Sequence, residues 1–191
     1  MQEIICEVNP DFIIETGTYQ GGTALFYAVL LDNLNKNGTV IAVDLIEPHP
    51  KIKEYRVWQE RVEFIQGGDC VSDEVIDKIA AMVEGHRVLV TLDSCHTQEH
   101  VLKELGLYSK FVSLNSYIVV QDTHLGGHPN NVSAISNLGG HLNSISAVPK
   151  GHGPMEAVDE FLEKNENFYS DRTKEKYWLT QNPKGFLKRI K

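Results

Sequence analysis

The residues best suited to chemistry in this 191-residue chain are acids that stand where short apolar runs end. Five of them are spread along the chain: Glu15, Asp44, Asp69, Asp93 and Asp122. In a parallel sheet the carboxyl ends of the strands meet at one edge, which is where open α/β proteins bind their ligands. Carboxylates gathered there repel one another unless a ligand or a cation compensates their charge. The pattern therefore predicts a ligand- or cation-binding edge.

A glycine-containing turn follows the first apolar run. Residues 12–23 read FIIETGTYQGGT and lead into a second apolar segment, Ala24–Leu31. A strand, a tight glycine turn and a helix start place a nucleotide-like ligand against backbone amides. The glycine spacing is G-x-x-x-G-G and not the dinucleotide G-x-G-x-x-G, so it points away from NAD and towards S-adenosylmethionine. Asp44, at the tip of the next apolar run, is suited to hold ribose hydroxyls.

Apolar periodicity and turn residues predict the elements that position these side chains. Strands are expected over 11–15, 39–44, 62–66, 87–93 and 117–122, and helices over 2–8, 22–34, 52–61, 72–83 and 98–112. Pro154 begins a further helix, and the tail is expected to form two antiparallel strands, 168–177 and 178–190. This alternation indicates an α/β fold, a mainly parallel sheet with helices on both faces. The polar stretch 123–153 lacks periodicity and is expected to be a lid.

Composition narrows the class of protein. The length predicts a single domain, residues 1–191, and 41% hydrophobic with 23% charged residues is ordinary for a soluble globular protein. A net charge of −8 disfavours a nucleic-acid partner, and no apolar run is long enough to span a bilayer. Three scattered cysteines read as reduced thiols of a cytoplasmic protein. The basic tail, residues 170–191, is interpreted as a solvated hairpin in preference to an anion site.

Together these motifs resemble known methyltransferases. The glycine turn is similar to the cofactor loop of the catechol-type, metal-dependent O-methyltransferases. The whole chain resembles the cephalosporin-hydroxylase-like family, which includes macrolide-sugar and rhamnosyl O-methyltransferases. The matching segments are QEII at 2–5, PDFIIETGT at 10–18, DSxH at 93–96, DT at 122–123, GPMEAV at 153–158 and LTxNPxG at 179–185. Two departures are noted: an N-terminal segment usual in the family is expected to be missing, and Gln121-Asp122 replaces Glu-Asp.

The resemblance implies a Rossmann-like class I methyltransferase with a mostly parallel, seven-stranded sheet and S-adenosylmethionine as cofactor. By analogy, Gly17 and Gly21 let the backbone approach the methionine part, and Thr23 bonds its carboxylate. Asp44 holds the ribose, and Asp69 lies near the adenine. Plainer interpretations exist, because a glycine after a strand is often only a turn and Asp69 can cap the next helix. The implied cofactor-binding residues are Glu15, Gly17, Thr18, Tyr19, Gly21, Thr23, Asp44, Asp69 and Asp93.

The resemblance also implies a metal site formed by Asp93, Gln121 and Asp122. A few oxygen donors that leave coordination positions open for water suit Mg²⁺. An Asp at a strand end can, however, also be a simple turn residue. His96, three residues after Asp93, stands where these families place a general base. His100 follows His96 by four residues, as in a zinc pair, but no third soft ligand at diagnostic spacing supports zinc.

The resulting hypothesis is a Mg²⁺- and S-adenosylmethionine-dependent O-methyltransferase that acts on a hydroxyl of a sugar or of a glycosylated small molecule. A homo-oligomer without nucleic-acid or membrane partners is expected. Two alternatives stay open: a non-catalytic protein that binds the cofactor or assists assembly, and a factor in the hydroxylation or methoxylation of a β-lactam. The chain has no His-x-Asp motif of iron oxygenases, so it would not be the oxygenase itself.

Overall fold

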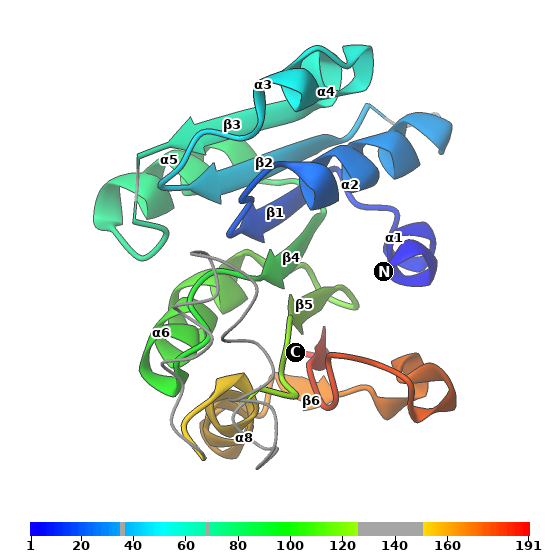
Figure 1. Cartoon of the computed structure of the whole chain (residues 1–191). Helices are drawn as coiled ribbons and strands as arrows, with labels where there is room; N and C mark the ends of the chain where they lie inside the picture. Colours follow the sequence, from blue (N-terminus) through cyan, green and yellow to red (C-terminus); the bar gives the residue numbers. More distant parts are fainter. Residues whose placement is uncertain (35–36, 68, 126–150) are drawn as a thin grey trace.

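A computed structural model describes residues 1–34, 37–67, 69–125 and 151–191 of the chain (Figure 1). Strands and helices alternate through most of these residues. In chain order they are α1 (Gln2–Val8), β1 (Phe12–Thr16), α2 (Gly22–Asn33), β2 (Thr39–Asp44), α3 (Pro50–Lys53), α4 (Arg56–Arg61), β3 (Val62–Gln66), α5 (Asp73–Val83), β4 (Val88–Leu92), α6 (Gln98–Tyr108), β5 (Tyr117–Val120), α8 (Pro154–Lys164), β6 (Phe168–Ser170) and β7 (Phe186–Arg189).

The strands form one seven-stranded sheet in the order β3-β2-β1-β4-β5-β7-β6. The first five are parallel, while β7 runs antiparallel to both β5 and β6. The predicted α/β class, the mostly parallel sheet and the closing antiparallel pair are confirmed. In register, Thr16 lies opposite Leu92, and Leu92 lies opposite Val120. The loops that follow β1, β4 and β5 therefore begin side by side.

Two apolar layers hold the helices against the sheet. On one face, α1, α2 and α4 cover side chains such as Ile13, Val40 and Leu89 (Figure 1). On the other face, α5, α6 and α8 cover a larger cluster that includes Ile14 and Val90. Neighbouring residues of β1 thus face opposite layers, as strand geometry requires. Burial on both faces explains why β1, β2 and β4 are continuous apolar runs.

The C-terminal tail departs from the predicted long hairpin. Only Phe168–Ser170 and Phe186–Arg189 are strands, and between them lie two short 3₁₀ helices, Arg172–Lys174 and Lys176–Trp178. The carboxylate of Asp171 ends the first strand, because it accepts a hydrogen bond from the Thr173 backbone N–H and begins the 3₁₀ turn. The expected strand 168–177 is therefore cut short by a local cap.

The helix predicted over 52–61 is also different in the structure. It consists of two short helices, α3 and α4, because Tyr55 has an extended backbone (φ −69°, ψ 130°). Apolar spacing does not detect a single extended residue inside a helical pattern. Residues 126–150 of the predicted lid lie outside the described residues.

The basic tail is joined to acids of the first helix. Lys174 contacts Glu3 and Glu7 at 3.2 and 2.5 Å, and Lys188 contacts Glu7 at 3.2 Å. These pairs connect the two ends of the described chain across α1 and β7. Among the described residues, no helix combines the length and the apolar character that crossing a bilayer would require.

Candidate active site

The glycine loop after β1 lies directly against the loop after β4. Gly17 has a φ of +79°, and a Cβ atom at this position would stand 1.9 Å from the Asp93 carbonyl oxygen. Gly21 is the N-cap of α2 with φ +90°, and a Cβ there would meet Ile52 and Trp58 at 3.0 Å. Side chains are excluded at both positions. The loop therefore leads into the amino end of α2, where unpaired N–H groups favour an anionic group such as a carboxylate.

Asp44, at the end of β2, is fixed by two backbone donors. Its Oδ2 accepts the N–H of Tyr19 at 2.6 Å, and its Oδ1 accepts the N–H of Ile46 at 2.9 Å. The structure thus brings Asp44 against the glycine loop, as the resemblance implied. Each carboxylate oxygen retains a second lone pair that can accept a hydroxyl.

Glu15 lies beneath this loop and not at its surface. The side chain is only 1% exposed, and its Oε2 has no hydrogen-bond partner. Burial raises the pKa of the Glu15 carboxyl to about 8; the nearby Thr18 hydroxyl opposes this shift, and the charges of Asp93 and Asp44 add to it. Glu15 and the buried Thr18 therefore support the loop from below. Thr23 is exposed in the first turn of α2.

Three side chains converge where β4 and β5 end. Ligand atoms of Asp93, His96 and Asp122 lie within 4.8 Å of one another. The His96 Nε2 atom is 3.9 Å from Asp93 Oδ1 and 3.8 Å from Asp122 Oδ2. His96 is buried, whereas both acids are partly open to solvent. The imidazole is thus held next to two carboxylates at the edge predicted from the sequence.

The electrostatics of this cluster favour a bound cation. Burial, with the charge of Asp122 as second cause, raises the pKa of Asp93 to about 8. Burial also lowers the pKa of His96, against the opposing effect of Asp122, which favours the neutral imidazole. Two carboxylates that share one site repel each other, and a divalent cation between them removes that repulsion. The two carboxylates fit a hard divalent cation, and the neutral imidazole lies beside them.

Gln121, which the resemblance implies as a metal ligand, is held by hydrogen bonds at both ends of its amide. Its Nε2 donates to Thr91 Oγ1 at 3.2 Å, and its Oε1 accepts from Asn182 Nδ2 at 2.6 Å. The amide is therefore engaged at both ends. Asn182 also accepts the backbone N–H of Asp122 at 2.8 Å, where Asp122 has a φ of +52°.

Asn182 was missed by the sequence reasoning as a functional candidate. It is 8% exposed and lies 60 residues beyond Asp122 in the chain, so no local spacing connects the two. The only available signal was its place in the LTxNPxG segment.

Asp69 does not join the cluster at the end of β4. Its Oδ1 accepts the Val71 N–H at 3.1 Å, so it forms a local turn, while Ser72 is the N-cap of α5. The expectation that His100 shares a helix face with His96 is wrong, because α6 begins only after Thr97. The side chain of His100 contacts Cys70 instead, with its Nε2 atom 3.4 Å from the sulfur.

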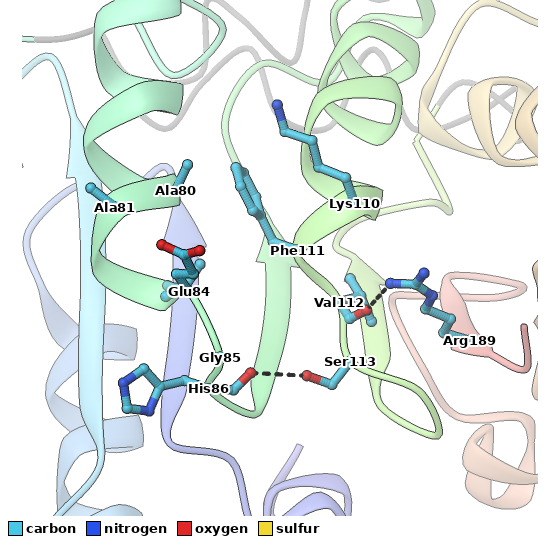
Figure 2. Close-up of a pocket in the computed structure, with 11 residues that line it drawn as sticks. Ala80, Ala81, Glu84, Gly85, His86, Lys110, Phe111, Val112, Ser113 and Arg189 are labelled. Atoms are coloured by element: carbon cyan, nitrogen blue, oxygen red, sulfur yellow. Dashed lines mark hydrogen bonds between the residues drawn. The ribbon is translucent and has the colours of Figure 1, made fainter.

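A cleft of about 540 Å³ lies at the opposite edge of the sheet (Figure 2). Glu84, Lys110, Phe111 and Arg189 line it, and the Arg189 guanidinium donates to the Val112 carbonyl at 2.5 Å. The segments around it precede β4 and β5, so the cleft is at the amino ends of the strands. Ligands of open α/β sheets bind beyond the carboxyl ends, which is where the acids converge.

Solved structures share this fold. A structure of CmcI with Mg and S-adenosylmethionine superposes with a TM-score of 0.63 and 14% identity, over all of this chain and 69% of that one. An O-methyltransferase from Bacillus cereus in complex with S-adenosylhomocysteine gives 0.59 and 14%, over all of this chain and 78% of the other. The chain therefore has a Rossmann-like methyltransferase fold.

Sequence comparison gives the family. The family model described as rhamnosyl O-methyltransferase/CmcI matches residues 1–190, so the chain belongs to this family. The rhamnosyl O-methyltransferase of Mycobacterium tuberculosis H37Rv is 30% identical over 190 residues, which are 97% of this chain and 70% of that protein. Its Mycobacterium leprae counterpart is 28% identical over 191 residues, 97% of this chain and 74% of that protein. The protein is an S-adenosylmethionine-dependent O-methyltransferase.

Proposed function

We propose that this protein methylates a hydroxyl of a sugar, or of a glycosylated small molecule, in a Mg²⁺-dependent reaction. The observation that carries the proposal is the convergence of Asp93, His96 and Asp122 next to the glycine loop. The rhamnosyl O-methyltransferases named above support a sugar acceptor. The CmcI structure with Mg and a structure of MycE with Mg and mycinamycin VI support the metal.

Asp93 and Asp122 would hold Mg²⁺, with water and the acceptor in its remaining positions. The ion would lower the pKa of an acceptor hydroxyl, whose ordinary value is far above neutrality. The Gln121 oxygen accepts from Asn182, which also holds the Asp122 backbone N–H, so we assign Gln121 to orienting the loop.

His96 would act as the general base. Burial keeps its imidazole neutral, and its Nε2 atom faces the space between the two carboxylates. A neutral Nε2 can accept the proton of a hydroxyl that enters this space. The glycine loop and Asp44 would hold the cofactor so that its methyl group faces the same space, since orientation supplies a large part of the rate.

The test is methyl transfer from labelled S-adenosylmethionine to a simple rhamnoside, with catechol as a non-sugar control acceptor. We expect transfer to the rhamnoside that needs added Mg²⁺. His96→Ala should reduce transfer about 10²–10⁴-fold while cofactor binding is retained. The exposed His86→Ala is the matched control and should behave as the parent protein.

Other outcomes would change the assignment. Transfer that continues in EDTA would contradict the metal. Cofactor binding without transfer to any hydroxyl, and indifferent to both Mg²⁺ and His96, would favour the non-catalytic alternative. Transfer to catechol alone would contradict the sugar acceptor.

A further inference from the structure

A second cluster of metal-ligating side chains lies on the other side of the β4 loop. Cys70 stands between β3 and α5, and its sulfur is 3.4 Å from His100 Nε2 and 3.4 Å from Glu104 Oε1. His100 and Glu104 are one turn apart on α6, with Nε2 and Oε2 separated by 3.8 Å. The ligand atoms of Asp69, Cys70 and His100 lie within 4.8 Å of one another, and Glu104 lies beside these three residues.

Glu104 is an independent sign that this cluster lacks a ligand. Its side chain is fully buried in the described structure, and its Oε2 atom has no hydrogen-bond partner. A buried carboxylate oxygen without a hydrogen-bond partner is costly and calls for a positive or donating partner. This oxygen is 3.8 Å from His100 Nε2, while the other carboxylate oxygen, Oε1, is 3.4 Å from the Cys70 sulfur.

The spacing of the donors matches a tetrahedral transition-metal site. Typical zinc bonds are about 2.3 Å to sulfur and about 2.0 Å to nitrogen or oxygen. Around a tetrahedral ion these lengths separate sulfur from nitrogen or oxygen by about 3.5 Å, and nitrogen from oxygen by about 3.3 Å. The observed separation of Cys70 Sγ and His100 Nε2 is 3.4 Å, and Glu104 offers a different oxygen to each of them, with Oε1 3.4 Å from the sulfur and Oε2 3.8 Å from the nitrogen. Small side-chain rotations would bring all three donors onto one ion.

We propose that Cys70, His100 and Glu104, with Asp69 as the fourth ligand, bind a thiophilic divalent cation such as Zn²⁺. This site shares no residue with the Asp93–His96–Asp122 cluster. It is also different in donor chemistry, because thiolate and imidazole select zinc, whereas carboxylates and water suit magnesium. The bound ion would deprotonate the Cys70 thiol and supply the partner that Glu104 Oε2 lacks.

The test is titration of the full-length, metal-free protein with Co²⁺, followed by displacement with Zn²⁺. A thiolate bound to Co²⁺ absorbs in the near ultraviolet, so this band reports a sulfur ligand and ignores a site made of carboxylates. We expect one equivalent of Co²⁺ to produce the band and Zn²⁺ to remove it. Cys70→Ser should abolish the band and weaken Zn²⁺ binding at least about 100-fold.

Matched variants separate this site from other sources of the signal. Cys6→Ser changes an exposed thiol, Cys95→Ser changes the remaining one, and both should keep the band. Asp122→Asn disrupts the other cluster and should also keep it. His100→Ala, at a partly exposed position, should lose it even if Cys70→Ser fails to fold. The proposal would be overturned if the parent protein gave no band, or if the band persisted in both Cys70→Ser and His100→Ala. The cluster would then be a hydrogen bond between the Cys70 thiol and the Glu104 carboxyl group.

Discussion

The two clusters at the carboxyl edge of the sheet differ in donors and in exposure. Asp93 and Asp122 offer partly exposed carboxylates around a buried imidazole. Cys70 and Glu104 offer a buried thiol and a fully buried carboxyl group. The loop after β4 serves both, since Asp93 and His96 face one cluster while Ser94 Oγ lies 3.7 Å from the Cys70 sulfur of the other. One short loop thus separates an oxygen-rich site from a sulfur-containing one.

The largest effect should come from removing an acid of the first cluster. Asp122→Asn removes one of two carboxylates around the expected Mg²⁺, and we expect methyl transfer to fall by about 10³-fold or more. The thiolate band of Co²⁺ should stay. Cys70→Ser should give the reverse pattern, with the band lost and transfer reduced far less than in Asp122→Asn. Steady-state rates and absorption spectra of both variants check this, and equal losses of both signals in either variant would mean that the clusters form a single site.

A smaller effect is expected at Asn182, which is bonded to the backbone of Asp122 and to the side chain of Gln121. Asn182→Ala removes the acceptor for the Asp122 N–H and the donor for Gln121 Oε1. Loss of such supporting bonds typically weakens a metal site about 10–100-fold. The Mg²⁺ concentration that gives half-maximal activity should therefore rise, and excess Mg²⁺ should restore much of the rate.

Two variants make the Asn182 experiment specific. Asn33→Ala removes an exposed amide near the end of α2 and should leave the Mg²⁺ dependence as in the parent protein. Asn182→Asp keeps the acceptor for Asp122 but not the donor for Gln121, so it separates the two bonds. An Asn182→Ala protein with a lower rate at every Mg²⁺ concentration and an unchanged midpoint would exclude the positioning role.

The smallest effect concerns stability. The Glu15 pKa of about 8 in the folded protein exceeds its ordinary value of 4.5, so the folded state keeps a proton that the unfolded state releases. The unfolding free energy should therefore decrease from about pH 4.5 to about pH 8, with a slope of at most about 1.4 kcal/mol per pH unit from this group. Glu15→Gln should flatten that slope, whereas the exposed Glu63→Gln should not. Urea midpoints between pH 5 and 8 measure the difference, and an unchanged slope in Glu15→Gln would mean that Glu15 titrates as an ordinary acid.

The carboxyl edge could be predicted because its geometry follows from parallel strands. Once β1, β4 and β5 are adjacent, Gly17, Asp93 and Asp122 must begin neighbouring loops. The apolar runs, the glycine turn and the acids that follow them carry this information locally. The family resemblance then added the assignment of cofactor and metal.

The remaining features depend on contacts between distant residues. Asn182 reaches Asp122 only because β7 lies beside β5, which brings the 181–185 segment to the edge. Glu104 is different: it stands among Val101, Leu105 and Tyr108 on the buried face of α6, so the helical pattern itself contained a buried acid. A buried acid on an apolar helix face is therefore a signal that the sequence itself contains. The tail failed as a hairpin because the Asp171 cap is stronger than strand propensity.

The contact between Gly17 and Asp93 has a consequence for the binding of the cofactor. No methyl group fits between Gly17 and the carbonyl oxygen of Asp93, so the two loops are in direct contact and one cannot move toward the other without displacing it. We expect a cofactor on the glycine loop and a cation at Asp93 to be linked through this contact, in which case each changes the affinity of the other by the same factor. We expect the affinity for S-adenosylmethionine to rise with the concentration of free Mg²⁺. The ionic conditions would then determine the fraction of the enzyme that has S-adenosylmethionine bound.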